Sequence, residues 1–298
     1  MIKEIKLINW KSFSEAVLYI DPLTVLIGSN AGGKSNALDA LLFLNRANII
    51  LSQVETLNLR KEIQEGARQV LSQMQNIFVF DPIPSHMRDY AQLSEKLMAD
   101  GSNIAGVLAG LEPERKQDVE RTLTHYLHDL PERDIKRIWT EPVGKFKTDA
   151  MLYCEEGWEN LPTHEIDARG MSDGTLRYLA IVTALLTREP NSLLIIEEVD
   201  NALHPSRAHL LVDMLKTLGK ARSIDVLVTT HNPALLDAAG VSMVPFITVA
   251  HRDEVTGFSQ LTQLEDIEQL PKLMAGGSLG HLSAQGSIES ALKQEGAR

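Results

Sequence analysis

Hydrophobic residues follow two different periods along this chain, and the two periods alternate. Apolar runs occur at 25–27 and 193–196, and a third lies within DVLVTTH at 225–231. Short runs bounded by polar residues are typical of buried strands, which are covered on both faces. Apolar residues recur at helical spacing over 34–45 and 175–186. Strands that alternate with helices in this way predict a parallel α/β sheet.

The middle and the end of the chain follow other patterns. An approximate helical stripe covers 55–75, and 87–138 also looks mainly helical, so we expect a mainly helical insert over 46–140. The Gly- and Ser-rich segment 276–298 predicts a loosely ordered tail. The chain 1–298 is then expected to form one domain that carries an insert.

Composition narrows the class of protein. The chain has 298 residues, of which 44% are hydrophobic and 23% charged, values that are ordinary for a soluble globular protein. No apolar run approaches the roughly 18 residues of a membrane helix, and the opening MIKEIKLINW is typical of an alternating strand, not of a secretory signal. Cys154 is the single cysteine, which excludes a disulfide framework and a cysteine-cluster metal site and agrees with a cytoplasmic location.

The charge balance bears on nucleic-acid binding. The formal net charge is −11, whereas proteins that bind nucleic acid through bulk electrostatics usually carry a basic excess. This balance weakens direct DNA binding without excluding a local basic groove. The most basic stretch, KRIWTEPVGKFK at 136–147, is interpreted as a solvated face, with nucleic-acid contact as the alternative.

The segment after the first apolar run has the form G-x-x-x-x-G-K-S. Strand, glycine loop and helix in this order predict a phosphate-binding P-loop. Backbone N–H groups and the helix N-terminus favour an anion. Lys34 should reach the β- and γ-phosphates, and the Ser35 hydroxyl should ligate Mg²⁺. The predicted nucleotide-binding residues are Gly28, Ser29, Asn30, Ala31, Gly32, Gly33, Lys34, Ser35 and Asn36.

Two adjacent carboxylates follow the second apolar run. Glu197 and Glu198 stand at the carboxyl end of this predicted strand, which is where ligands bind in open α/β sheets. One carboxylate can join the Mg²⁺ shell, and the other can orient or deprotonate an attacking water. Two glutamates after a strand more often form a solvated loop, but the P-loop upstream favours the catalytic interpretation.

Two further positions are candidates for contact with phosphate. His231 follows the third apolar run directly, a position suited to sensing a γ-phosphate, although a lone histidine there is more often structural. Ser172, Asp173 and Gly174 precede the apolar helix, so their N–H groups and hydroxyl can bind an anion. By itself this tripeptide is a helix cap.

The order and spacing of these four segments resemble the head of ABC-class ATPases. NWKSF at 9–13, IEEVDNALHP at 196–205 and TTHNPALLD at 229–237 are similar to the RecF/SMC/OLD-like branch of that class. DPIPSHMR and DGSNIAGVLAGL also resemble segments of small bacterial RecF-like predicted ATPases. The resemblance covers most of 1–265 and implies a P-loop head that binds and hydrolyses ATP.

The resemblance also implies roles for single residues. Glu197 matches the Walker B acid that holds Mg²⁺, Glu198 the catalytic base and His231 the switch histidine. Ser172, Asp173 and Gly174 match the signature motif, which contacts the γ-phosphate bound by the other subunit. Asp200 matches a residue of the D-loop, and Lys11 matches a residue near the nucleotide.

Three features depart from the family pattern. Val199 replaces a common proline, so a less rigid turn is expected after the catalytic acid. The signature tripeptide is S-D-G instead of the familiar S-G-G. No glutamine is assigned to the Q-loop, for which the candidates are Gln53, Gln69, Gln73 and Gln75.

The function that the resemblance implies is a dimeric switch in which two chains enclose two ATP molecules and separate after hydrolysis. The insert would act on a separate partner protein, in DNA maintenance or antiphage defence, and the sequence leaves nucleic acid open as a partner. The alternative is a nucleotide-locked scaffold with little turnover. The chain lacks the sustained heptads of an SMC-type arm, the short remainder after Phe258 does not suit a fused nuclease, and the motifs do not favour a transporter subunit at a membrane.

Overall fold

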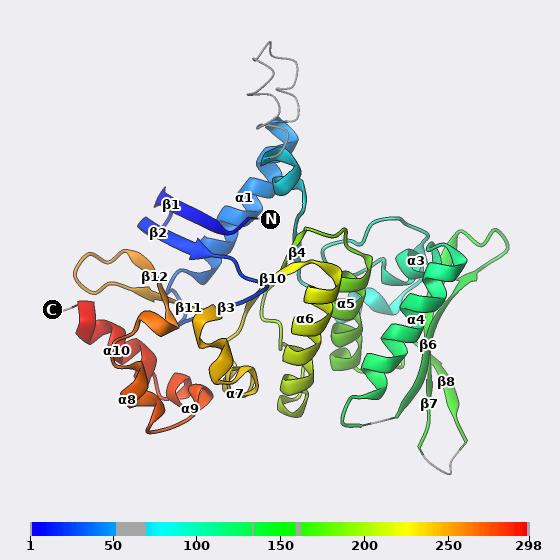
Figure 1. Ribbon diagram of the computed structural model, residues 1–298. Helices are drawn as coiled ribbons and strands as arrows, with labels where there is room; N and C mark the ends of the chain where they lie inside the picture. Colours follow the sequence, from blue (N-terminus) through cyan, green and yellow to red (C-terminus); the bar gives the residue numbers. More distant parts are fainter. Residues whose placement is uncertain (1, 52–69, 133, 159–161, 297–298) are drawn as a thin grey trace. The chain divides into compact units, whose positions relative to one another are not determined.

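The computed structural model describes residues 2–51, 70–132, 134–158 and 162–296, which belong to two compact units (Figure 1). Unit 1 comprises Met1–Val79, Glu189–Val199 and Ser223–Arg298, and unit 2 comprises Phe80–Arg188 and Asp200–Arg222. Most of the helical stripe predicted at 55–75 lies outside the described residues. Among the helices that are described, none combines the length and the apolar character that a bilayer crossing requires.

Unit 1 is built around a six-stranded sheet with the strand order β12–β11–β3–β10–β9–β4. Strand β3 pairs in parallel with both β10 and β11, and β9 pairs in parallel with β10. All residues of β3, β9 and β10 are buried, as their apolar runs predict. The strands are β3 (Leu23–Ile27), β4 (Ile77–Phe80), β9 (Leu193–Ile196), β10 (Asp225–Thr229), β11 (Ile247–Arg252) and β12 (Ser259–Gln263), the last antiparallel to β11.

An antiparallel hairpin and the long helix α1 cover part of this sheet. The hairpin is β1 (Glu4–Trp10) and β2 (Phe13–Tyr19), and α1 spans Lys34–Leu51. Phe13, Leu38 and Leu41 are almost fully buried and join hairpin, helix and sheet in one core. The Trp10 indole donates to the carbonyl of Asn36 at 2.8 Å, so the hairpin also holds the beginning of α1.

The last part of unit 1 is helical. Figure 1 shows α8, α9 and α10 gathered near α7. The segments are α7 (Pro233–Ala239), η4 (Val241–Phe246), η5 (Leu264–Asp266), α8 (Leu270–Met274), α9 (Leu279–Ala284) and α10 (Ser287–Gly296).

The prediction of a loosely ordered tail over 276–298 is therefore corrected for the residues described up to 296. The glycine and serine residues serve as contacts and caps in this segment. Ser278 caps α9, and Gly280 lies so close to α7 that a Cβ atom would stand 2.1 Å from the Pro233 carbonyl oxygen. The Gly280 amide donates to the Asp237 carboxylate at 2.6 Å. A Gly/Ser-rich composition here reflects close packing of helices.

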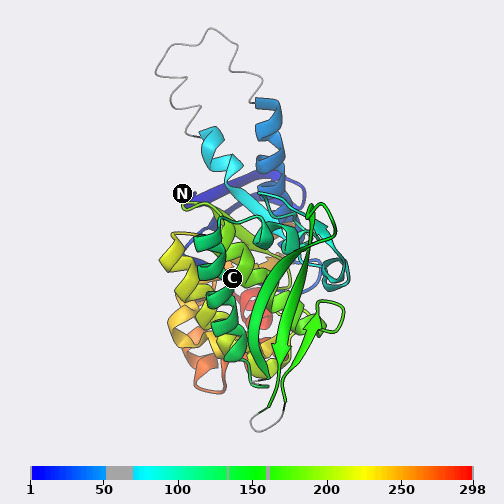
Figure 2. The same ribbon diagram turned by 90° about the vertical axis from the view of Figure 1, so that its right-hand side faces the viewer.

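Unit 2 combines an antiparallel sheet with helices. The sheet order is β5–β7–β6, with β8 also paired to β7, and α3 and α4 pack on it (Figure 2, green strands). Helix α5 is buried over almost its whole length and packs against α4 and α6. The elements are η2 (Pro84–Arg88), β5 (Ala91–Gln92), α3 (Ile104–Ala109), α4 (Pro113–His128), β6 (Ile135–Val143), β7 (Asp149–Glu156), β8 (His164–Asp167), α5 (Asp173–Thr187), η3 (Pro205–Arg207) and α6 (Ala208–Arg222).

Where the structure describes it, the expected insert at 46–140 contains strands as well as its predominant helices. It contains β4 and β5, and β6 begins within it at Ile135. The register of β6 against β7 shifts between Ile135 and Arg137. Such a bulge places the buried residues Ile135 and Ile138 three positions apart, which resembles a helical period in the sequence.

Candidate functional site

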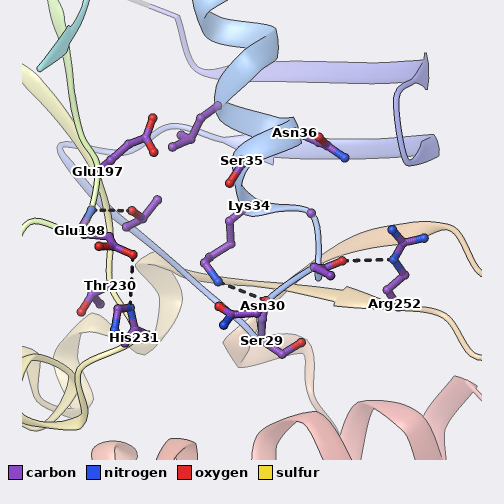
Figure 3. A pocket seen from close by; sticks show the side chains of 14 residues that line it. Ser29, Asn30, Lys34, Ser35, Asn36, Glu197, Glu198, Thr230, His231 and Arg252 are labelled. Carbon is purple, nitrogen blue, oxygen red and sulfur yellow. Dashed lines mark hydrogen bonds and ion pairs between the residues drawn. The ribbon is translucent and has the colours of Figure 1, made fainter. Parts of the chain in front are cut away.

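A cavity of about 370 Å³ lies at the carboxyl edge of the sheet in unit 1. Its walls come from the segments that follow β3, β9 and β10 and from the last residue of β11 (Figure 3). Because these strands run parallel, their carboxyl ends meet at one edge. The lining residues are Ser29, Asn30, Ala31, Gly33, Lys34, Ser35, Asn36, Leu38, Glu197, Glu198, Thr229, Thr230, His231 and Arg252.

The loop between β3 and α1 depends on close contact with β11. A Cβ atom on Gly28 would stand 2.0 Å from the Ala250 carbonyl oxygen, and one on Gly32 would stand 2.4 Å from the same atom. Gly28 also has a φ of +134°, a conformation that residues other than glycine rarely adopt. The sequence therefore needs glycine at both positions so that the loop can rest on the backbone of β11 and keep its N–H groups at the cavity.

Lys34 is folded back on this loop. Its Nζ donates to the carbonyls of Gly28 at 2.5 Å and Ser29 at 3.2 Å. Burial lowers the pKa of the Lys34 ammonium, and the nearby Glu198 and Glu289 carboxylates oppose that shift. The side chain thus places a partly desolvated cation at the centre of the cavity, where an anion can take over the donors that now contact carbonyl oxygens.

The two glutamates after β9 occupy one wall of the cavity. Glu198 has a φ of +43°, an uncommon conformation for a residue with a side chain. Its amide donates to the Thr229 hydroxyl at 2.9 Å, and the next amide, of Val199, donates to the Thr229 carbonyl at 3.1 Å. Strand β10 therefore holds the strained turn in place.

Val199 changes the expectation of a loose turn. Its side chain is fully buried, and its N–H makes a hydrogen bond that a proline could not make. The packing of the Val199 side chain and its backbone hydrogen bond restrain this turn, as a proline ring would in the family pattern.

His231 faces the same wall. Its Nδ1 lies 3.8 Å from Oε1 of Glu198, and both side chains are more than half exposed to the cavity and solvent. An exposed pair at this distance contributes little to stability. The pair therefore contributes little to the fold, and both side chains line the cavity.

Ser35 and Glu197 provide oxygen donors that suit Mg²⁺. Both line the cavity, Ser35 from the start of α1 and Glu197 from the end of β9 (Figure 3). In proteins Mg²⁺ takes few protein oxygens and completes its shell with water and substrate phosphates. Across the residues that the structure describes, there is no group of three or more His, Cys, Asp and Glu side chains placed to hold a metal.

The predicted signature tripeptide belongs to unit 2, whereas unit 1 forms the cavity. Ser172 caps α5: its Oγ accepts from the Thr175 amide at 3.1 Å and lies 2.8 Å from the Thr175 hydroxyl. A Cβ atom on Gly174 would stand 2.8 Å from the Ala202 carbonyl oxygen. The signature turn and the turn that begins at Asp200 are therefore in direct contact within unit 2.

Arg88 holds the signature turn and was not identified from the sequence. One guanidinium nitrogen donates to the carbonyls of Ala168, Arg169 and Met171 at 3.1, 2.9 and 2.8 Å, and the other donates to the Asp173 carboxylate at 2.5 Å. Asp173, which departs from the common glycine, thus stands beside a cation. The only sequence signal was that Arg88 belongs to the family-like segment DPIPSHMR.

Arg252 is the second residue that sequence reasoning missed. Its Nε donates to the Ala31 carbonyl at 3.1 Å, and NH1 donates to the Gly257 carbonyl at 2.7 Å. The available signal was a single arginine at the end of an unassigned strand. Lys11, by contrast, was expected near the nucleotide, but it does not line the cavity and its ammonium pairs with Asp39 on α1.

Comparisons with known proteins agree with this architecture. Residues 1–98 match the family model described as AAA ATPase domain, and residues 102–237 match the one described as AAA domain, putative AbiEii toxin, Type IV TA system. Among curated proteins, none matches this chain.

Three solved structures are similar to this chain. An SMC head bound to the C-winged helix domain of ScpA has a TM-score of 0.58 and 12% identity, over 87% of this chain and 96% of that chain. An SMC head domain from Thermotoga maritima has a TM-score of 0.49 and 13% identity, over 88% and 98%. CbiO1 of an ABC transporter complex from Clostridium perfringens has a TM-score of 0.48 and 13% identity, over 96% and 97%.

The first of these structures, at 12% identity, demonstrates the fold alone. The two ATPase-domain matches follow each other along the chain with a gap of three residues, 99–101. Together with the P-loop context and the head-like fold, they identify the chain as a member of the ABC-class ATPases, in the branch that contains the RecF- and SMC-like AAA ATPase domains.

Proposed function

We propose that this protein is an ATP-driven dimeric switch that binds ATP with Mg²⁺, hydrolyses it, and controls a separate partner protein. The observation that carries the proposal is the convergence of Lys34, Ser35, Glu197, Glu198 and His231 on one cavity at the carboxyl edge of the sheet. A cation, two carboxylates and a histidine around a glycine loop suit the charge and the proton transfer of phosphoryl chemistry.

Each of these side chains has a role in the proposal. Lys34 exchanges its two carbonyl acceptors for oxygens of the β- and γ-phosphates. Ser35 and Glu197 hold Mg²⁺, which neutralises phosphate charge when it is bound. Glu198 accepts a proton from the attacking water, and His231 orients the γ-phosphate end. The hydrogen bonds from the Glu198 and Val199 amides to Thr229 keep the Glu198 carboxylate directed toward the attacking water.

A second chain completes the site in this proposal. Ser172 at the N-terminus of α5 donates its hydroxyl to the γ-phosphate held by the other subunit, and Asp200 lies beside the same interface. The Asp173 carboxylate would repel that phosphate, but the Arg88 guanidinium at 2.5 Å compensates its charge. An arrangement of this kind is isologous, because each chain offers the same two faces to its partner.

The partner and the biological setting come from the relatives. One solved SMC head is bound to a winged-helix domain of ScpA, and one matching family is described as a putative AbiEii toxin of a type IV toxin–antitoxin system. From these two relatives we infer that this chain controls an effector protein in antiphage defence or DNA maintenance. Unit 2, which contains the signature turn, is the part that we assign to partner contact.

The first experiment compares Glu198→Gln with the wild type. The amide keeps the shape of the side chain but cannot accept the proton, so we expect ATP binding to remain and hydrolysis to fall by about 10²- to 10⁴-fold. Glu165→Gln, on the exposed strand β8 of unit 2, is the matched control and should hydrolyse normally. Unchanged hydrolysis in Glu198→Gln contradicts the assignment, and wild-type turnover too slow to release a dimer supports the scaffold alternative.

The second experiment tests the composite site. Lys34→Ala and Ser172→Arg subunits are each expected to be inactive, since the first lacks the phosphate cation and the second blocks closure sterically. In a mixed dimer both defects fall in one site and the other site is intact. Recovery of activity up to about half of the wild-type value, together with ATP-dependent heterodimer formation, supports the arrangement. Normal hydrolysis by a monomeric Ser172→Arg protein contradicts it.

A further inference from the structure

The antiparallel sheet of unit 2 has two faces of different character. Successive residues of a strand point to opposite faces, and Ile138, Leu152 and Cys154 are buried on the side where α3 and α4 pack. Trp139 and Tyr153, which stand directly opposite each other on β6 and β7, belong to the other side. We name this other side the aromatic face.

Three aromatic rings gather on the aromatic face. The rings of Trp139 and Tyr153 stack with their centroids 5.7 Å apart. Burial raises the pKa of the Tyr153 hydroxyl, and the neighbouring Tyr90 hydroxyl, just before β5, acts in the same direction. The Tyr90 side chain is 52% exposed. Aromatic side chains that reach the surface in this way are typical anchors of protein interfaces.

The chain already places guanidinium groups on two of these rings. The Arg137 guanidinium lies 4.9 Å from the centroid of the Trp139 ring, and the Arg169 guanidinium lies 6.0 Å from that of Tyr90. A planar cation over an aromatic ring is a favourable contact. Among the described residues, no cation lies over the third ring, Tyr153. The aromatic face thus binds guanidinium groups of its own chain and has one ring that can take another.

Carboxylates surround this third ring. Glu141 on β6 is exposed, and Asp167 on β8 stands directly opposite Tyr153. Both carboxylates act on the Tyr153 hydroxyl in the direction that raises its pKa, which places their charges near it. Strand β7 adds Asp149 and Glu155 at alternate positions on the same face. The carboxylates therefore outnumber the two guanidinium groups, and the excess of negative charge suits a cationic partner.

The basic stretch 136–147 does not make this face a nucleic-acid site. Arg137 stands directly opposite Glu155, so its charge is offset by a carboxylate. Lys145 and Lys147 lie in the turn after β6 and not among the paired residues of the strands. Phosphates on the aromatic face would meet its excess of carboxylates and be repelled. The charge pattern favours a protein partner.

The aromatic face continues into the segment that holds the signature turn. Asp167 accepts from the Arg169 amide at 3.0 Å and pairs with the Arg169 guanidinium. The Arg169 carbonyl in turn accepts from Arg88 at 2.9 Å, and Arg88 also donates to Asp173. A group that binds at Asp167 therefore touches the contacts that position the signature turn.

We propose that the aromatic face docks a partner protein through an arginine-rich segment, with one guanidinium group on Tyr153 between Glu141 and Asp167. This inference deepens the assignment of unit 2 to partner contact and rests on that part of the proposed function. Arginine fits better than lysine because its planar fork stacks on a ring and can donate two hydrogen bonds to one carboxylate.

The experiment measures the binding of a fluorescent arginine–glycine repeat peptide and of its lysine–glycine counterpart, at physiological ionic strength and without nucleotide. We expect the wild type to bind the arginine peptide at least about threefold more tightly. Tyr153→Leu and Glu141→Gln should each weaken its binding about two- to fivefold, and the double variant about tenfold. Glu141→Gln keeps an acceptor for the Trp139 indole, so it provides the test if Tyr153→Leu does not fold.

Two matched variants separate the aromatic face from general charge and surface. Glu114→Gln removes an exposed carboxylate of α4, which packs on the other side of the sheet, and Tyr19→Leu removes an exposed ring of β2 in unit 1. Both should leave the affinity for the arginine peptide unchanged. If Glu114→Gln weakens binding as much as Glu141→Gln, the peptide responds only to the net charge of −11, and the proposal is overturned.

The remaining outcomes identify other occupants. A wild type that binds neither peptide, or both equally, overturns the arginine assignment. Tighter binding of a single-stranded oligonucleotide than of the arginine peptide makes nucleic acid the occupant, and nucleotide-free dimerisation that Tyr153→Leu abolishes makes a second copy the occupant; each overturns the proposal. Because no nucleotide is present, these results do not depend on the ATP site, which the Glu198→Gln comparison tests separately.

Discussion

Arg88 offers a direct test of whether the signature turn is held in place for function. We choose Arg88→Lys because lysine keeps the positive charge and loses the planar fork of donors. In the structure one guanidinium nitrogen contacts three carbonyls and the other contacts Asp173. A single ammonium group has three donors on one nitrogen and cannot reach all four acceptors in the same geometry, so at least one hydrogen bond is lost and we take two as the expected loss.

The magnitude follows from these contacts. Each hydrogen bond contributes about 0.5–1.5 kcal/mol, so the loss of two lowers the free energy of unfolding by about 1–3 kcal/mol. The Arg88 side chain is 27% exposed and Asp173 63% exposed, so their ion pair adds at most about 1 kcal/mol and is mostly kept by lysine. Arg88→Met, which loses all four bonds and the charge, should be destabilised further.

The assays are urea unfolding, ATP binding and ATP hydrolysis on the same preparations. Binding should stay close to the wild type because Arg88 belongs to unit 2 and the P-loop cavity to unit 1. Hydrolysis and ATP-dependent dimerisation should fall, since Ser172 is no longer held for a partner subunit. Arg121→Lys is the control: Arg121 is 74% exposed and pairs only with Asp118 on the helix surface at 3.3 Å among the described contacts.

Two results would refute this reasoning. Wild-type stability and hydrolysis in Arg88→Lys show that the turn does not depend on the guanidinium. Equal losses of ATP binding and hydrolysis show that the substitution acts on the whole fold and not on the signature turn.

Three other substitutions or measurements test single features. Lys34→Ala should abolish ATP binding without lowering the melting temperature by more than a few degrees, since its ammonium contacts loop carbonyls and not the core; unchanged affinity contradicts the P-loop assignment. Gly32→Ala should weaken ATP binding strongly, because its Cβ would stand 2.4 Å from the Ala250 carbonyl oxygen. Titration calorimetry measures the ATP affinity of this variant, and unchanged affinity shows that the loop shifts to accept the methyl group. Burial raises the pKa of the Cys154 thiol, with Glu156 beside it, so Cys154 stays protonated at pH 8 and should react with iodoacetamide only as unit 2 opens; immediate labelling of the native protein contradicts this.

The sequence was sufficient for the parts of the fold that have strong local signals. The apolar runs at β3, β9 and β10 are short and fully buried, and the glycine loop follows a strand and precedes a helix, so each element could be placed before the structure was known. The residues that converge at the cavity could be predicted for the same reason, since the carboxyl ends of parallel strands meet.

The rest depends on contacts between distant segments. The bulge at Ile135 gives the buried residues of a strand the spacing of a helix. Gly280 permits close contact between two helices, whereas the composition of this segment alone suggests disorder. Arg88 and Arg252 act on loops 80 or more residues away in sequence. No local pattern indicates such partners, so side chains that support a site are harder to predict than those that form it.

The central position of β3 has a consequence for the order in which this protein is made. Both neighbours of β3 in the sheet, β10 and β11, begin at Asp225 and Ile247, whereas β3 ends at Ile27. At about 5–20 residues per second, the ribosome needs roughly 10–40 s to add the intervening segment. Until then the glycine loop has no β11 backbone on which to rest. The nascent chain therefore cannot form this cavity until β11 has been added.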